Sequence, residues 1–231
     1  MNLFILTGAG VSAESGLGVF RGTGAALWKR YDPMQLATPE AFARDPALVH
    51  EFYNARRRNL IAASPNAAHV ALARLEADLA QRGDALTLVT QNIDDLHERA
   101  GSTSVIHMHG ELLKARCASC GGVRECRDDL AVDSRCGCAG ALRPHVVWFG
   151  ETPLFMDEIL AALEVADLFV AIGTSGAVYP AAGFVREARA KGLRCCELNL
   201  APSDNAEEFD DSRYGPASEI VPSWVEEILA L

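Results

Sequence analysis

Short apolar runs that end in small or polar residues recur along the chain, and segments with helical spacing separate them. The first run, Leu3 to Leu6, leads into Thr7 and Gly8, and a later run, residues 167–172, leads into Gly173. Strands of this kind that alternate with helices form a parallel sheet covered on both faces. The pattern therefore predicts an α/β protein with a doubly wound parallel sheet.

Proline, glycine and serine mark where many of the expected elements begin and end. Strands are predicted at residues 3–7, 85–90, from Val105 to the histidines that follow it, and at 146–149, 167–172, 193–198 and 218–221. Helices are predicted as a pair within residues 38–63, the second starting at Pro46, and then at 66–81, 156–165, 180–191 and from Pro222 onward. The sequence shows no internal repeat and no low-complexity stretch.

The turn after the first strand has the composition of a phosphate-binding loop. Gly8-Ala9-Gly10-Val11-Ser12-Ala13 fits the G-x-G-x-x-G/A pattern, in which backbone N–H groups hold a pyrophosphate. A dehydrogenase would continue with a second strand and an acidic residue about 20 positions later. Residues 16–28 are instead rich in glycine and contain no second apolar strand. We therefore expect a dinucleotide site of altered form, with this segment as a cover over the reacting end.

Composition limits the class of protein. The chain has 231 residues, of which 49% are apolar and 23% charged, which suits one sizeable core with a smaller appended module. The formal charge of −10 argues against nucleic-acid binding. No apolar run approaches the roughly 20 residues of a membrane span. An apolar strand at residue 3 leads us to expect no signal peptide, and hence a cytoplasmic protein.

Five of the seven cysteines lie close together in a pattern typical of a metal site. Cys117 and Cys120 are separated by two residues, whereas Cys136 and Cys138 are separated by one. Two such pairs match a four-cysteine zinc ribbon, a closed site that stabilises the fold without chemistry. Because the second gap is tight, Cys126 could substitute as a ligand. A redox-active dithiol is the main alternative.

Polar side chains follow the strand at 85–90, where ligands of an open α/β sheet collect. Gln91, Asn92 and Asp94 are therefore site candidates, with Ile93 between them; Asp94 could equally cap the next helix. His107 and His109 are two apart, so on a strand they would face the same way. His109, followed by Gly110, is placed for proton transfer, although a satisfied core histidine is the alternative.

Two further segments contain aromatic side chains whose role the pattern leaves open. Tyr53 and Arg56 share a helix face, which also suits an aromatic packed beside a solvated arginine in the basic run with Arg57 and Arg58. The segment Val146-Val147-Trp148-Phe149 could pair with an extended peptide beside a cleft, or pack in the core, or do both.

Taken in order, these motifs resemble those of sirtuins, which are NAD-dependent protein-lysine deacylases. The resemblance rests on Gly8 to Gly16, Phe20-Arg21, Thr90 to Asp94, His107 to Glu111, the paired cysteines, Val147 to Glu151 and Gly173 to Ser175. It covers essentially the whole chain. Ala37, Tyr53 and Arg56 further resemble the acyl pocket of the class III subgroup, which also removes succinyl and malonyl groups. The segment from Leu142 to Glu151 is most similar to that of bacterial members.

The resemblance implies roles for individual residues. His109 would act as general base on a ribose hydroxyl, while Asn92 and Asp94 would hold the nicotinamide and ribose end of NAD. Phe20 and Arg21 would belong to the covering loop. Tyr53 and Arg56 would bind a succinyl carboxylate, since a charge in an apolar tunnel needs a cation and a hydroxyl donor. NAD would further contact Gly8, Ala9, Gly10, Ser12, Ala13, Glu14, Gln91, Ile93, Gly173, Thr174, Ser175, Asn199, Leu200, Ala201 and Ala217.

The same resemblance predicts a Rossmann-like NAD-binding domain with a smaller zinc-ribbon and helical module. The expected division is residues 1–21, 84–110 and 143–231 for the first domain, 22–83 for the cofactor loop and helical module, and 111–142 for the zinc module. The expected partners are acylated-lysine proteins, with the chain acting as a monomer. Gly18-Val19 departs from the family pattern. Mono-ADP-ribosyl transfer to protein and a non-enzymatic nucleotide-sensing zinc ribbon are the alternatives.

Overall fold

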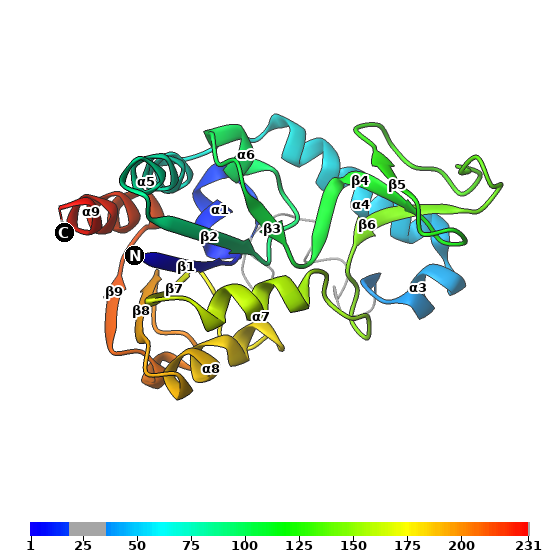
Figure 1. The fold of residues 1–231 in the computed structure, drawn as a ribbon. Helices are drawn as coiled ribbons and strands as arrows, with labels where there is room; N and C mark the ends of the chain where they lie inside the picture. Colours follow the sequence, from blue (N-terminus) through cyan, green and yellow to red (C-terminus); the bar gives the residue numbers. More distant parts are fainter. Residues whose placement is uncertain (19–35, 231) are drawn as a thin grey trace.

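The computed structural model describes residues 1–18 and 36–230. Its larger body is a six-stranded sheet of order β3-β2-β1-β7-β8-β9, in which every neighbouring pair is parallel (Figure 1). This arrangement confirms the predicted doubly wound sheet. The strands are β1 (Asn2–Thr7), β2 (Ala85–Thr90), β3 (Val105–His107), β7 (Leu168–Ile172), β8 (Arg194–Asn199) and β9 (Asp211–Tyr214).

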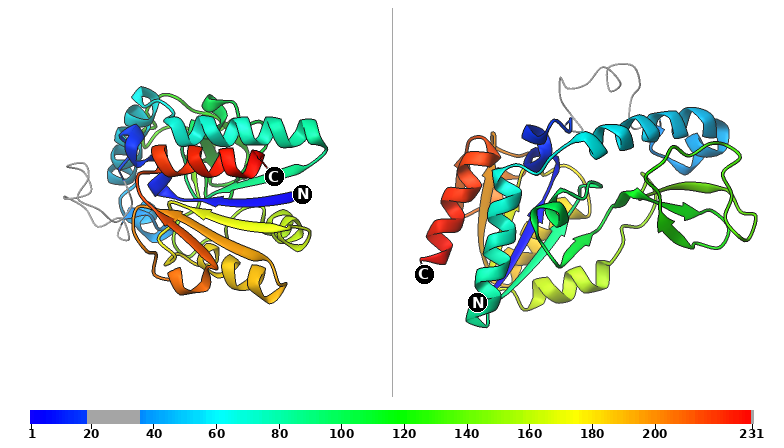
Figure 2. Two further views of the ribbon diagram at one scale, coloured as in Figure 1. Left: turned by 90° about the vertical axis from the view of Figure 1, so that its left-hand side faces the viewer. Right: turned by 90° about the horizontal axis from the view of Figure 1, so that it is seen from above.

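Alternating side chains of β1 point into two separate cores. Leu3 and Ile5 join one apolar cluster, and Phe4 and Leu6 join the other, as the period of two along a strand requires. Helices cover both faces (Figure 2). They are α1 (Ala9–Ser12), α5 (Ala67–Arg82), α6 (Leu96–Ala100), α7 (Met156–Glu164), α8 (Phe184–Ala190) and α9 (Ala217–Leu229), with single 3-10 turns at Ala13–Ser15, Ala181–Gly183 and Ala206–Glu208.

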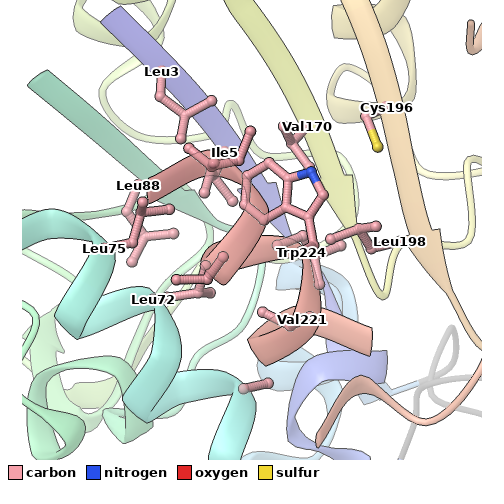
Figure 3. Close-up of a cluster of buried hydrophobic side chains, with 14 of the residues drawn as sticks. Leu3, Ile5, Leu72, Leu75, Leu88, Val170, Cys196, Leu198, Val221 and Trp224 are labelled. Atoms are coloured by element: carbon pink, nitrogen blue, oxygen red, sulfur yellow. The ribbon is translucent and has the colours of Figure 1, made fainter. Parts of the chain in front are cut away.

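The strand predicted at residues 218–221 is wrong, because these residues begin α9 and Pro222 lies inside the helix. Val221, Trp224, Val225 and Ile228 recur at helical spacing and are all buried. Figure 3 shows Trp224 among Leu72 and Leu75 of α5 and side chains of the sheet. The apolar burial along this face outweighs the hydrogen bond that a proline removes from a helix.

The strand β9 was not expected at all. Its sequence, Asp211-Ser212-Arg213-Tyr214, is polar, and its residues are half-buried or exposed at the edge of the sheet. An edge strand of this kind has no apolar run to reveal it.

The smaller body joins a three-stranded antiparallel sheet to two helices. The sheet has the order β5-β4-β6, with β4 (Gly110–Cys117), β5 (Val123–Glu125) and β6 (Leu142–Val146). Helices α3 (Pro39–Arg44) and α4 (Pro46–Ala62) begin at the predicted prolines, where Thr38 and Asp45 cap them. The strand expected at 146–149 is wrong beyond Val146, since β6 ends there. No helix among the described residues is long and apolar enough to cross a membrane.

The turn after β1 contacts the end of β7 through backbone alone. Gly10 N–H donates to Gly173 O at 2.9 Å, and a Cβ at Gly10 would lie 2.7 Å from Gly173 Cα. Gly173 itself has a φ of +62°, and a Cβ there would lie 2.5 Å from the backbone nitrogen of Val11. Side chains at these positions would force the two strand ends apart.

We predict that Gly173→Ala destabilises the protein by about 2–5 kcal/mol, because left-handed strain adds to a clash with rigid backbone. The matched control is Gly16→Ala. Gly16 also has a positive φ, of +82°, but nothing lies within 4 Å of the position that a Cβ would take there, so only about 1–2 kcal/mol of strain is expected. Urea unfolding measures both variants. Equal losses would contradict the close approach.

Candidate active site and metal centre

The predicted nucleotide residues gather at one edge of the large sheet. Residues 8–13 follow β1, 91–94 follow β2, 173–175 follow β7 and 199–201 follow β8. Because these strands are parallel, their carboxyl ends meet at this edge (Figure 1). Asn199 Nδ2 donates to Thr174 O at 2.7 Å. At the start of α9, next to Ala217, the N–H and hydroxyl of Ser218 both donate to Glu14.

A buried polar cluster lies behind the first turn. Asn92 Nδ2 donates to Gly8 O at 3.1 Å and to Ser12 Oγ at 3.2 Å, and the Ser12 hydroxyl donates to Asp94 Oδ2 at 3.0 Å. Asp94 Oδ1 also accepts from the N–H of Leu96 in α6, although the N-cap position of that helix is taken by Asp95 and not by Asp94 as the alternative expected. Burial raises the pKa of Asp94, against the opposing hydrogen bonds from Leu96 and Ser12.

Sequence reasoning missed two buried histidines beside this cluster. The N–H of Asn66, the N-cap of α5, donates to His69 Nδ1, so the His69 proton sits on Nε2 and is donated to Ser12 Oγ at 3.3 Å. Burial lowers the pKa of His69 to about 4. His97 Nε2 lies 3.1 Å from Thr7 Oγ1. The only sequence signal was the three-residue spacing of Asn66 and His69 at a helix start.

His109 lies between β3 and β4, half-buried, beside the residues that follow β2. Its Nδ1–H donates to Gln91 O at 2.9 Å, which leaves Nε2 as the basic nitrogen. Burial lowers its pKa below the ordinary value, although the Gln91 carbonyl acts in the opposite direction. Because β3 ends at His107, the expected common face with His109 does not arise. His107 instead bonds Glu98 Oε1 at 2.5 Å.

Tyr53 and Arg56 lie in the apolar cluster of the smaller body. Tyr53 is buried, and its hydroxyl accepts from Trp148 Nε1 at 2.9 Å. The half-buried Arg56 guanidinium lies 5.9 Å from the Tyr53 ring centre. Burial lowers the pKa of Arg56, whereas the charges of Tyr53 and Asp94 act to raise it, which brings this pocket within electrostatic reach of the polar cluster. The alternative of a solvated arginine fits Arg58 instead, which is exposed and pairs with Asp129.

In the segment from Val146 to Phe149, three backbone N–H groups donate hydrogen bonds to other residues of the protein. Val147 N–H donates to His109 O, Trp148 N–H to Glu151 Oε2, and Phe149 N–H to Ala37 O, at 2.8–2.9 Å. Val146 and Trp148 are buried. The core-packing alternative therefore holds, and hydrogen bonds of the segment link Ala37 to the backbone of His109, the candidate base. Phe20, Arg21 and Val19 lie outside the described residues.

Four cysteines form a compact cluster at the end of the smaller body. The sulfurs of Cys117, Cys120, Cys136 and Cys138 all lie within 4.8 Å of one another. Backbone N–H groups of Cys120 and Ser119 lower the pKa of Cys117 to about 6, which favours the thiolate that binds metal. This donor set fits a closed four-thiolate zinc site. Cys126 is outside the cluster and donates to Asp128 O at 3.4 Å.

We predict that Cys120→Ser abolishes stoichiometric zinc binding and lowers the melting temperature, because a structural zinc contributes directly to folding. Cys126→Ser is the matched control and should retain one zinc per chain, since Cys126 lies outside the cluster. Elemental analysis of the purified proteins measures both. Loss of zinc in the Cys126 variant would contradict this ligand set.

The model of the Sir2 family matches residues 8–180, a stretch that contains the polar cluster, Tyr53, Arg56, His109 and the four cysteines. The chain belongs to the Sir2 family.

Relatives of this Sir2 chain resemble it along its whole length. A Caulobacter vibrioides protein named NAD-dependent protein deacylase is 62% identical over 100% of this chain and 98% of its own. An Escherichia coli K12 protein of the same name is 56% identical, over 98% of this chain and 82% of its own. A Sir2 homologue solved as an NAD complex is 41% identical with a TM-score of 0.87, covering 98% of this chain and 88% of that one.

Proposed function

We propose that this Sir2 protein is an NAD-dependent protein-lysine deacylase that releases nicotinamide and O-acyl-ADP-ribose. The observation that carries the proposal is the joining of Ser12, Asn92 and Asp94 beside His109 at the carboxyl edge of the sheet. The relatives named as deacylases support it, as does a Sir2 homologue solved with 2′-O-acetyl-ADP-ribose, which is 40% identical with a TM-score of 0.89.

The residues divide the work by their chemistry. NAD supplies the ribose carbon that the acyl-lysine amide oxygen attacks, and nicotinamide is the leaving group. Backbone N–H groups of the glycine turn after β1 would hold the pyrophosphate, and Asn92 and Asp94 would orient the ribose and nicotinamide end. His109 Nε2 would take a proton from a ribose hydroxyl. The nucleophile is part of the substrate, so the mechanism needs no serine or cysteine nucleophile from the protein.

The pH dependence of turnover follows from the environment of His109. A base works in its neutral form, and the pKa of His109 lies below the ordinary value of 6.5. We therefore predict that kcat/KM falls as His109 takes up a proton and reaches half of its maximum at a pH below 6.5. His109→Ala should lose about 10²–10⁴-fold in rate. A pH profile with half of the activity already lost above 6.5 would contradict this role.

We further propose that the enzyme accepts succinyl and malonyl groups as well as acetyl groups. A carboxylate that enters an apolar pocket needs a cation and a donor. Arg56 provides the cation. Burial raises the pKa of Tyr53, so its hydroxyl remains protonated and can donate. Ala37 is also buried in this cluster.

Replacement of the cation separates the two substrate classes. We predict that Arg56→Met lowers kcat/KM for a succinyl-lysine peptide by about 10²-fold, since a charged contact contributes about 1.5–3 kcal/mol. Deacetylation of the same peptide sequence should fall far less. Arg58→Met, which changes an exposed arginine two residues on, is the matched control and should affect neither. An equal loss with both substrates would refute the pocket.

Mass spectrometry of the products tests the reaction itself. A succinyl-lysine peptide incubated with NAD should yield the unmodified peptide, nicotinamide and O-succinyl-ADP-ribose in equal amounts. If labelled ADP-ribose appeared on protein instead, the activity would be mono-ADP-ribosyl transfer. If the enzyme formed neither product, a nucleotide-binding module without catalysis would remain.

The state of the cysteines bears on the compartment of the enzyme. None of the seven forms a disulfide, which supports the reducing cytoplasm as its compartment. We propose that it acts there as a monomer on acylated proteins. Sedimentation at micromolar concentration tests the oligomeric state.

A further inference from the structure

The acyl pocket contains a hydrogen bond whose direction is fixed by chemistry. Trp148 Nε1 lies 2.9 Å from the Tyr53 hydroxyl oxygen, and both side chains are buried. An indole nitrogen can only donate, whereas a phenol oxygen has one proton and two lone pairs. The bond therefore occupies a lone pair of Tyr53 and leaves the phenol proton for a different acceptor.

The indole that makes this bond is held from several sides. The Arg143 guanidinium lies 3.4 Å from the ring centre of Trp148, and the Phe42 ring lies 5.4 Å from it. Arg143 is itself paired with both oxygens of Glu151, at 2.6 and 2.8 Å. Glu151 also accepts the backbone N–H of Trp148 at 2.8 Å. The indole N–H consequently has little freedom to turn away from Tyr53.

The charges of this clamp persist at neutral pH. Burial acts to raise the pKa of Glu151, but hydrogen bonds from Arg143 and from the Trp148 N–H outweigh it, so its pKa lies below the ordinary value. Glu151 thus stays ionised and continues to hold Arg143 against the indole face.

We propose that Trp148 is a positioning residue for acyl selectivity, whose N–H turns the Tyr53 hydroxyl so that its proton points to the carboxylate of an acidic acyl group. This inference rests on the acidic acyl pocket of the proposed function. An acetyl group has no carboxylate to accept that proton. The indole therefore favours succinyl over acetyl without contacting the carboxylate.

A double-mutant cycle measures this effect. The variants are Trp148→Phe, Tyr53→Phe and the combination, and the readout is the ratio of affinities for succinyl-lysine and acetyl-lysine forms of one fluorescent peptide, without NAD. Trp148→Phe keeps a ring over Arg143 and removes the N–H. We expect it to lower the ratio about three- to tenfold, the effect of one neutral hydrogen bond. In the Tyr53→Phe background it should leave the ratio unchanged.

The ratio compares two peptides on the same protein, so a loss of folded protein affects both affinities alike. Trp224→Phe, on the buried face of α9 in the core of the large sheet, is the matched control and should not change the ratio. An unchanged ratio in Trp148→Phe, or the same decrease in both Tyr53 backgrounds, would overturn the inference.

The design also separates this inference from the proposed reaction. If the protein prefers the succinyl peptide through Trp148 but forms no O-acyl-ADP-ribose, the proposed reaction is contradicted and the role of Trp148 is supported. If the unmutated protein binds both peptides equally, the role of Trp148 in selectivity is contradicted. If that protein still turns over the acetyl peptide, the deacylase function is supported independently.

Discussion

The hydroxyl of Ser12 is the point at which the separate parts of the candidate active site are joined. It accepts from Asn92 and His69 and donates to Asp94, so the turn after β1, the end of β2 and the cap of α5 share one oxygen. A buried carboxylate is costly unless hydrogen bonds satisfy it, and this network supplies them. These hydrogen bonds fix the direction of the Asp94 side chain. They therefore set which part of the carboxyl edge of the sheet a ribose would contact.

The proposed reaction divides between the two bodies of the protein. The large sheet would bind the nucleotide, and the helices and small sheet would form the acyl pocket. Contacts between the bodies include the hydrogen bond from Val147 N–H to the carbonyl of His109, and the charge of Asp94 acts to raise the pKa of Arg56. The cysteine cluster lies at the far end of the small sheet, which suits a role in stability, because β4 runs from Gly110, beside the candidate base, to Cys117.

The sequence predicts features that are built from neighbouring residues. It does not predict contacts between residues that lie far apart along the chain. The turn after β1, the polar residues after β2 and the cysteine pairs were all predicted, because each is a short motif and parallel strands align their ends. The link between Trp148 and Tyr53 spans 95 positions and leaves no local pattern. The same holds for His97 beside Thr7. The strand β9 has no apolar pattern because its residues are polar, and a proline at position 222 predicts a helix start where the helix has in fact already begun at Ala217.

The proposed reaction requires that the ribose of NAD and the acyl group of the substrate meet at one place, between His109 and Arg56. A crystal structure with a succinyl-lysine peptide and a non-reacting NAD analogue measures this directly. We predict a ribose hydroxyl within hydrogen-bonding distance of His109 Nε2 and the succinyl carboxylate between Tyr53 and Arg56. A dinucleotide bound away from the turn after β1, or a carboxylate turned out to solvent, would contradict the account.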